Sequence, residues 1–299
     1  MQYLIESTSE TPIEILKNQF EKQGYLLLRS FFPTEIIQKV RNAVVSVLED
    51  EQWGTYKEGI FHAIAPARRI NSPAFHACIA KIMAKEIVHE LADTPSLQSF
   101  LSELLGEKVF AHPRKMARIT FPHDFEPNDR IPPHQDLFYV KGEQDTFTAW
   151  IPLGDYPPEL GGLLVSPGTH KMGLLPTKAN DEGRFGCNAV EDILSGLKWY
   201  QAHYHVGDVL IMHGLTLHQS GYNKSQQFRL SLDCRFSSAH GHINEEQLLP
   251  PYYPHVPSWQ KLSEGWARPD RFTAPNTLII DSKDKPLSEV MSSTTRFAK

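Results

Sequence analysis

Three side chains in this sequence have the types that bind a transition metal, at a spacing that extended backbone can use. His134 and Asp136 lie two apart in Pro-Pro-His-Gln-Asp. The prolines favour extended backbone, in which residues two apart project to the same side. His218 follows in Gly-Leu-Thr-Leu-His-Gln-Ser. Two histidines and one carboxylate form the facial triad of non-haem iron(II) oxygenases, so the sequence predicts a metal site made of His134, Asp136 and His218.

Other histidines compete for this role, and a His-x-Asp pair is expected by chance in a chain with 14 histidines. His203 and His205 lie two apart, as do His240 and His242. No carboxylate stands at matching spacing beside them in a strand flanked by turns. We interpret these four, and His170 after a Ser-Pro-Gly-Thr turn, as structural or surface residues.

The segment 228–236 supports the metal site because its nine residues alternate strictly between apolar and polar. Such alternation predicts a strand with one apolar face. Arg229 and Ser231 then face either solvent or a cavity. A fixed guanidinium in a cavity holds the far carboxylate of a dicarboxylate by two parallel hydrogen bonds, while the near end chelates the metal. An exposed strand arginine remains the alternative.

The elements that must position these residues change in type along the chain. Thr11 as N-cap and Pro12 at the first helical position predict the start of a helix that runs to about Lys22, and Gly24 ends it. A short buried strand is expected next, at residues 25–29. One helix is expected to begin at Pro33, and another runs from Thr94 to a stop at Gly106. The first hundred residues are therefore expected to be mostly helical.

From Lys108 onward, short runs separated by Pro and Gly are typical of a barrel or sandwich. The expected strands are 114–121, 147–152, 163–165, 209–213 and 228–236. We predict a single domain, 1–299, in three parts: a mostly helical N-terminal cover (1–107), a β core (108–240) and a C-terminal extension (241–299) that could cover the site. Within the extension, the aromatic, proline-rich residues 250–259 suit either a lid or a packed crossover.

Composition narrows the class of protein. A 40% hydrophobic content fits a globular chain, and a net charge of −5 without a long basic block does not fit a nucleic-acid binder. The three cysteines, Cys78, Cys187 and Cys234, lie far apart and form no CxxC pair. No run approaches the ~18 apolar residues that cross a membrane. The opening residues lack the pattern of a signal peptide, so we expect a cytoplasmic protein with a small-molecule partner rather than nucleic acid or membrane.

Several motifs together resemble the phytanoyl-CoA dioxygenase family. They are the His-x-Asp pair, the stretch Gly-Gly-Leu-Leu-Val-Ser-Pro-Gly-Thr-His at 161–170, the Gly-Asp-Val strand at 207–209, and His218 followed by Ser at two and Arg at eleven. Residues 24–32 are similar as well, so the resemblance covers about residues 12–240. It implies a mainly β fold with helical cover, a double-stranded β-helix (jelly roll, cupin-like), carrying iron(II) and 2-oxoglutarate.

The resemblance also implies roles for single residues. His134, Asp136 and His218 would be metal ligands, Arg229 and Ser220 would bind the cosubstrate carboxylate, and Thr120 would be a further polar contact. The implied enzyme is a dioxygenase that uses O2 to hydroxylate or otherwise oxidise an unactivated C–H bond, releasing succinate and CO2. Three facial ligands leave positions for the keto acid and dioxygen, so no other side chain is needed as an acid or base.

The substrate is less defined by the sequence. Phe138, Tyr139 and Trp150 lie near the metal residues in sequence and are candidates for substrate binding or for core packing. Two basic runs could meet a phosphate or carboxylate, for example of a CoA ester, or be solvated faces: Arg68 with Arg69, and Arg114 and Lys115 with Arg118.

Two other functions remain open. The same site could hold zinc in a hydrolase, which leaves Arg229 without a role, or the chain could be a non-catalytic jelly-roll binding protein.

Overall fold

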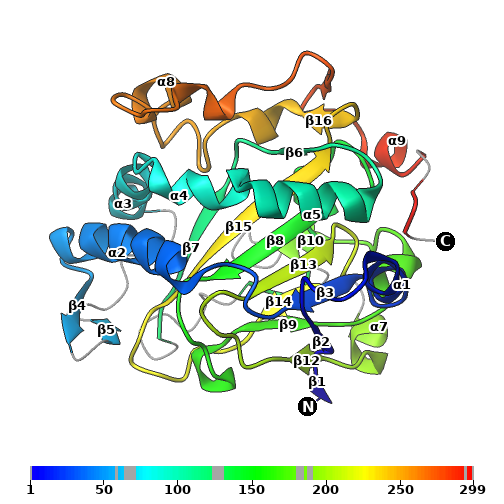
Figure 1. Ribbon diagram of the computed structural model, residues 1–299, viewed down its shortest axis with the longest axis horizontal. Coiled ribbons are helices and arrows are strands. Elements are labelled where there is room, and N and C mark those ends of the chain that lie inside the picture. The colour runs from blue at the N-terminus through cyan, green and yellow to red at the C-terminus, as the bar shows by residue number, and fades with distance from the viewer. Residues whose placement is uncertain are drawn as a thin grey trace.

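A computed structural model describes residues 2–57, 60–63, 72–122, 131–179, 185–186, 191–292 and 295–297. Two sheets form its centre (Figure 1). The larger sheet has the order β2–β3–β13–β8–β15–β6, and β7 also pairs with β15. Its strands are β2 (Glu6–Ser7), β3 (Tyr25–Leu28), β6 (Val109–Ala111), β7 (Met116–Thr120), β8 (Phe147–Pro152), β13 (Val209–His213) and β15 (Arg229–Ser238).

The smaller sheet has the order β1–β12–β9–β14. Its strands are β1 (Gln2–Tyr3), β9 (Leu163–Val165), β12 (Tyr200–Gln201) and β14 (His218–Ser220). Residues 131–134 extend this sheet beside β14: the Ser220 amide donates to the Ile131 carbonyl at 3.1 Å, and His134 bridges to His218. The two facing sheets confirm the predicted jelly roll.

Three two-stranded pairings, nine α-helices and several short 3-10 helices complete the described part of the chain. The pairings are β4 (Gly54–Lys57) with β5 (Ile60–Ala63), β10 (Lys178–Ala179) with β11 (Phe185–Gly186), and β16 (His242–Asn244) with β17 (Ile279–Asp281). The helices are α1 (Ile13–Gln23), α2 (Thr34–Asp50), α3 (Pro73–Met83), α4 (Ile87–Glu90), α5 (Pro95–Leu105), α6 (Leu137–Val140), α7 (Glu191–Gly196), α8 (Trp259–Leu262) and α9 (Leu287–Met291).

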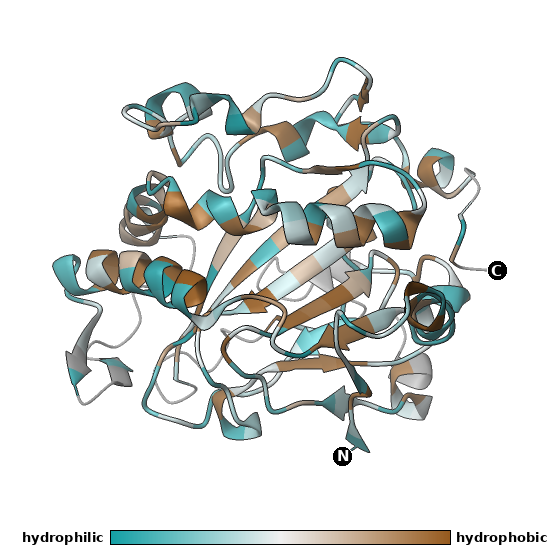
Figure 2. Cartoon of the chain, in the orientation of Figure 1, coloured by the Kyte–Doolittle hydropathy of each residue, from teal (hydrophilic) through white to brown (hydrophobic). Residues whose placement is uncertain are grey.

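Helices α2 to α5 cover one face of the larger sheet (Figure 1). They carry stripes of hydrophobic residues between hydrophilic ones (Figure 2), as expected of helices that bury one side. Leu48 of α2 and Leu101 of α5 belong to the same buried core as Ala149 of β8 and Leu232 of β15. The opposite face of the sheet meets the smaller sheet in a second core that includes Trp150.

The structure of strand β15 shows where the polar side chains of the alternating segment point. Its apolar side chains at positions 230, 232, 234 and 236, and Phe228 just before the strand, lie in the helix-side core. The alternate residues Arg229, Ser231, Asp233 and Arg235 are also buried. Because successive strand residues point to opposite faces, these polar side chains lie between the two sheets. The polar face therefore lines an interior cavity rather than solvent.

Most predicted elements match the structure, with exceptions at the N-terminus. Helix α1 begins at Ile13 with Pro12 as its N-cap and no side-chain cap, so the expected capping role of Thr11 is wrong. The Thr11 hydroxyl instead accepts from the Thr8 amide at 3.4 Å. Strand β3 lies inside the larger sheet, so residues 1–107 supply more than a cover. Helix α3, capped by Ser72, was not predicted from the sequence.

The aromatic residues 250–259 pack against helix α3. The Tyr252 ring lies 5.4 Å from the rings of Phe75 and His76, and Val256 and Trp259 are buried. This packing fits the crossover interpretation of the segment. The division of the chain into three parts stays a prediction. Among the described helices, none is long and apolar enough to span a bilayer.

Gly24 lies between the end of α1 and the loop before His218, and we expect its replacement to lower the free energy of unfolding. It has φ +75°, and an added Cβ would lie 2.4 Å from His170 Nδ1 and 2.5 Å from Thr216 Oγ1. Gly106 is the matched control, because it has φ +84° with nothing within 4 Å of such a Cβ. Gly106→Ala should lower the free energy of unfolding by about 1–2 kcal/mol. Gly24→Ala should cost a further ~1–3 kcal/mol from overpacking, and equal losses in denaturant titrations would disprove this.

Candidate metal centre

The smaller sheet brings the two predicted histidine ligands together. The His134 amide donates to the His218 carbonyl at 2.9 Å, and the His218 amide donates to the His134 carbonyl at 3.0 Å. This reciprocal pairing places the two imidazole rings 4.2 Å apart between centroids. Asp136 immediately precedes the short helix α6, and all three side chains are buried. Residues 84 positions apart in sequence thus share one place in the fold.

The three side chains have a separation that one metal ion can span. His134 Nε2 lies 3.7 Å and His218 Nε2 lies 4.0 Å from Asp136 Oδ1. The candidate ligand atoms of the three residues all lie within 4.8 Å of one another. Since metal–ligand bonds of about 2.1 Å bring two ligand atoms to at most about 4.2 Å apart, small shifts would bring all three onto one ion.

Backbone carbonyls orient both imidazoles for metal binding. His134 Nδ1 lies 2.9 Å from the Pro132 carbonyl and His218 Nδ1 lies 3.0 Å from the Thr216 carbonyl. Because a carbonyl only accepts, each Nδ1 carries the proton and each Nε2 offers its lone pair to the metal. Burial, followed by the neighbouring His134, lowers the pKa of His218 to about 4. His218 is therefore a neutral donor at pH 7.

Asp136 is held as a carboxylate by two neighbours from the larger sheet. The Thr148 hydroxyl donates to Oδ2 at 2.5 Å, and Arg235 Nη2 donates to Oδ1 at 3.2 Å. Burial by itself raises the pKa of Asp136, but the charge of Arg235 holds it well below its usual value. The group that faces the histidines is an anion, which suits a divalent cation.

Arg229 lies at the other end of the same cavity. Its Nη2 donates to the Thr120 hydroxyl at 2.7 Å, and its Nη1 lies 3.4 Å from the Ser231 hydroxyl. The guanidinium carbon is 5.6 Å from the ring centroid of Trp150, and the residue is 2% exposed. Arg229 on β15 and Thr120 on β7 lie opposite each other in the sheet. The register of the two strands therefore fixes the position of this buried cation.

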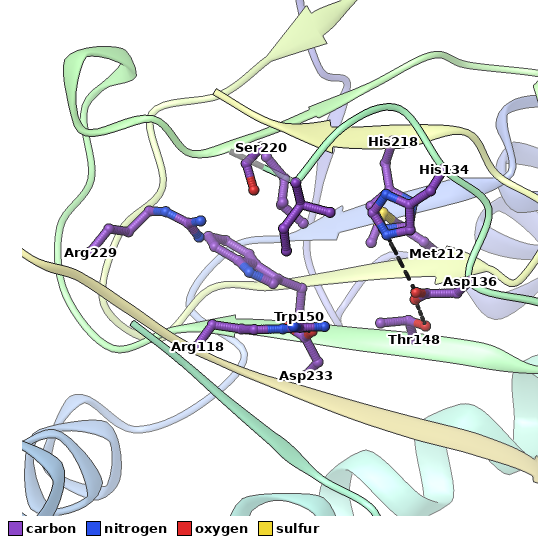
Figure 3. A pocket seen from close by; sticks show the side chains of 12 residues that line it. Arg118, His134, Asp136, Thr148, Trp150, Met212, His218, Ser220, Arg229 and Asp233 are labelled. Carbon is purple, nitrogen blue, oxygen red and sulfur yellow. Dashed lines mark hydrogen bonds and ion pairs between the residues drawn. The ribbon is translucent and has the colours of Figure 1, made fainter. Parts of the chain in front are cut away.

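A narrow cavity lies between the sheets and opens to solvent (Figure 3). The histidines and Asp136 lie at one end, and Arg229 and Ser220 lie at the other (Figure 3). Its remaining lining is Arg118, Ile131, Thr148, Trp150, Leu163, Met212 and Asp233. A metal site at one end and a fixed cation at the other are the two groups that a short dianion chelating the metal would need.

Of the three candidate substrate residues, one lines the cavity and two do not. Trp150 lines the cavity, but at the Arg229 end. Tyr139 is 37% exposed, and its ring lies 5.7 Å from that of His134. Phe138 packs edge-on against Tyr139, and neither residue belongs to the described cavity lining.

The competing histidines lie elsewhere. His203 stacks on His205, His242 pairs with Asp281, and His170 bonds to the Glu21 carbonyl. Arg68 and Arg69 lie outside the described residues, as does Cys187.

Sequence reasoning missed Thr148, Asp233 and Arg235. Asp233 and Arg235 continue the alternation that identified Arg229 and Ser231, and this signal was available. Thr148 reaches Asp136 from a neighbouring strand, which no local pattern indicates.

Comparisons with known proteins agree with this geometry. The family model described as phytanoyl-CoA dioxygenase (PhyH) matches residues 20–231. The 1-deoxypentalenic acid 11-beta-hydroxylase of Streptomyces exfoliatus is 28% identical over 249 residues, covering 79% of this chain and 85% of the relative. The peroxisomal phytanoyl-CoA dioxygenase of Homo sapiens is 27% identical over 237 residues, covering 75% and 68%.

A solved structure shares the fold. It is the non-heme alpha ketoglutarate dependent carbocyclase SnoK from nogalamycin biosynthesis, with a TM-score of 0.58 and 18% identity. The likeness covers 80% of this chain and 90% of that one.

Proposed function

The chain belongs to the phytanoyl-CoA dioxygenase family, and from this premise we propose that His134, Asp136 and His218 bind iron(II) while Arg229 binds the far carboxylate of 2-oxoglutarate. The protein is a non-haem iron(II)- and 2-oxoglutarate-dependent dioxygenase. The observation that carries the assignment of residues is one buried cavity with a His–Asp–His cluster at one end and Arg229 at the other.

The bound iron and 2-oxoglutarate supply the oxidising chemistry: one O2 is consumed, a substrate C–H becomes C–OH, and 2-oxoglutarate becomes succinate and CO2. The protein's own residues position these partners. His134, Asp136 and His218 would hold the metal and would leave room on it for the cosubstrate. Arg229, held by Thr120 and Ser231, would fix the direction of the cosubstrate, and Ser220, which lines the same cavity, would contact the same carboxylate.

The two alternative functions explain less of the site. A zinc hydrolase would use the same three ligands, but it gives no role to the buried guanidinium of Arg229 at the far end. A non-catalytic binding protein does not need two imidazole Nε2 atoms and a carboxylate directed at one point. Neither alternative is favoured by the family to which the chain belongs.

Succinate formation tests the function. The protein would be incubated in air with 2-oxoglutarate, a pool of small metabolites, and either iron(II) or zinc(II). We expect metabolite-dependent succinate release with iron(II) and none with zinc(II) or with the His218→Ala variant. Product formation with zinc(II) and no oxygen uptake would support the hydrolase instead.

The aspartate ligand predicts oxygenation rather than halogenation. Transfer of chloride would require chloride in a metal position that Asp136 would hold. In chloride buffer, mass spectrometry should therefore find oxidised products without chlorine. Asp136→Gly opens the position but also removes an anionic ligand, so we expect that variant to be mostly inactive. Chlorinated product from the unaltered protein would show that Asp136 is not a ligand.

The partner is a small molecule, and its identity is a matter for experiment. One relative is named for a carboxylic acid and another for a CoA ester. The cytoplasmic location stays a prediction from the sequence.

A further inference from the structure

Arg118 stands at the opening of the metal cavity and has no part in the proposed function. Of the twelve residues that line the cavity, Arg118 and Ile131 are the two that are not buried. The Arg118 side chain is 25% exposed, whereas Arg229 is 2% exposed. The Arg229 end, which would hold the cosubstrate, is thus the deep end of the cavity. Arg118 lies where a substrate would enter from solvent.

One carboxylate fixes the direction of Arg118. Its Nε donates to Asp233 Oδ2 at 2.6 Å, and Arg235 Nη2 reaches the same oxygen at 3.4 Å. Because the Nε side of the guanidinium is taken, the two Nη groups form the edge that remains for a ligand. In Figure 3 the Arg118 side chain runs along the cavity toward Thr148 and Asp136. Its guanidinium is therefore directed at the metal end rather than at Arg229.

The charges of the cavity do not balance without a further anion. Arg118, Arg229 and Arg235 are cations, while Asp136 and Asp233 are anions. Iron(II) and the 2-oxoglutarate dianion would cancel each other, and histidine ligands are neutral. One positive charge is left over, and it is shared by Arg118 and Arg235, which both pair with Asp233. A partly buried group of charges with one surplus positive charge is unfavourable, so a ligand with a single negative charge is preferred over a neutral one.

We propose that Arg118 binds a carboxylate of the substrate, so that the enzyme oxidises a carboxylic acid rather than its neutral ester or amide. The inference rests on the proposed function. A planar guanidinium edge and a carboxylate match each other in two parallel hydrogen bonds. Asp233 acts as a positioning residue, because it orients the guanidinium without facing the substrate's reactive carbon.

The test uses matched sets of small molecules, each a carboxylic acid with its methyl ester and primary amide. Succinate release is measured with iron(II) and 2-oxoglutarate in air. Binding of the acids is measured without oxygen, from the change that they cause in the visible charge-transfer band of the iron–keto acid centre. We expect acids to stimulate succinate release and their neutral counterparts to do so at least about tenfold less, since a hydrogen bond to a charged group is lost.

Variants at two arginines make the test specific. Arg118→Gln should reduce the preference for acid over amide by about ten- to hundredfold, mainly through KM and anaerobic binding, with no change in the 2-oxoglutarate requirement. Arg118→Lys keeps the charge and should retain part of the preference, which guards against a folding defect in the first variant. Arg268 is exposed and pairs with Asp270, so Arg268→Gln should behave as the unaltered protein.

Several results would overturn the inference. An unchanged acid preference in Arg118→Gln would do so, as would neutral compounds as the best triggers, or no response to any acid although the charge-transfer band forms. A raised 2-oxoglutarate requirement with the acid preference intact would assign Arg118 to the cosubstrate. By contrast, failure of the unaltered protein to form the band with iron(II) and 2-oxoglutarate would refute the proposed function itself.

Discussion

His134→Ala and His218→Ala are each expected to abolish iron binding at stoichiometric metal. Both imidazoles direct Nε2 toward Asp136, and each is oriented by a backbone carbonyl. Loss of an outer hydrogen-bond partner already weakens metal sites by about 10- to 100-fold, and loss of a ligand itself should cost more. Equilibrium dialysis with iron(II) under anaerobic conditions, followed by metal analysis of the protein, measures the effect.

The matched controls are His203→Ala and His240→Ala. His203 stacks on His205 away from the cavity, and His240 is exposed. Both variants should bind iron as the unaltered protein does. If His203→Ala lost iron while His218→Ala kept it, the assignment of ligands would be wrong.

Arg229→Ala is expected to raise the 2-oxoglutarate requirement strongly while iron affinity changes little. Removing one partner of a desolvated, charge-assisted pair costs on the order of 2–5 kcal/mol, or about 30-fold or more in affinity. Arg229 lies at the end of the cavity opposite the metal residues, which is why the two effects should separate. Titration of 2-oxoglutarate against the anaerobic iron protein gives both quantities.

Arg229→Lys is the informative companion variant. It keeps a positive charge but loses the two parallel donors, so we expect an intermediate 2-oxoglutarate requirement. An equal requirement in Arg229→Ala and the unaltered protein would place the cosubstrate elsewhere.

The parts of the site that the sequence predicted follow local rules. The His-x-Asp pair predicted a shared side, and the two side chains do face each other at 3.7 Å. The alternation of 228–236 predicted a strand with one polar face, and β15 has that face. Periodicity gave no means of choosing between solvent and cavity, because that depends on the second sheet.

The parts that the sequence missed depend on pairing between distant strands. Arg235 contacts Asp136 across 99 positions, and its register partner Thr148 on β8 contacts the same carboxylate. Phe138 and Tyr139 show the converse. They are close to Asp136 in sequence, but the helical turn of α6 carries them out of the cavity lining.

Local rules also failed where two signals compete at one helix start. Thr11 is a good cap in isolation, but Pro12 takes the N-cap position with extended ψ of 133°. The threonine then lies one residue too early to reach the first free amides of the helix.

The central claim is that one centre binds iron(II) and 2-oxoglutarate together, and anaerobic reconstitution tests it most directly. Iron(II) is added to the metal-free protein, then 2-oxoglutarate, while the visible spectrum is recorded. We predict a weak charge-transfer band that saturates at one iron per chain and is absent in His134→Ala. In Arg229→Ala the band should need far more 2-oxoglutarate. Stoichiometric iron without any band at saturating 2-oxoglutarate would contradict the account.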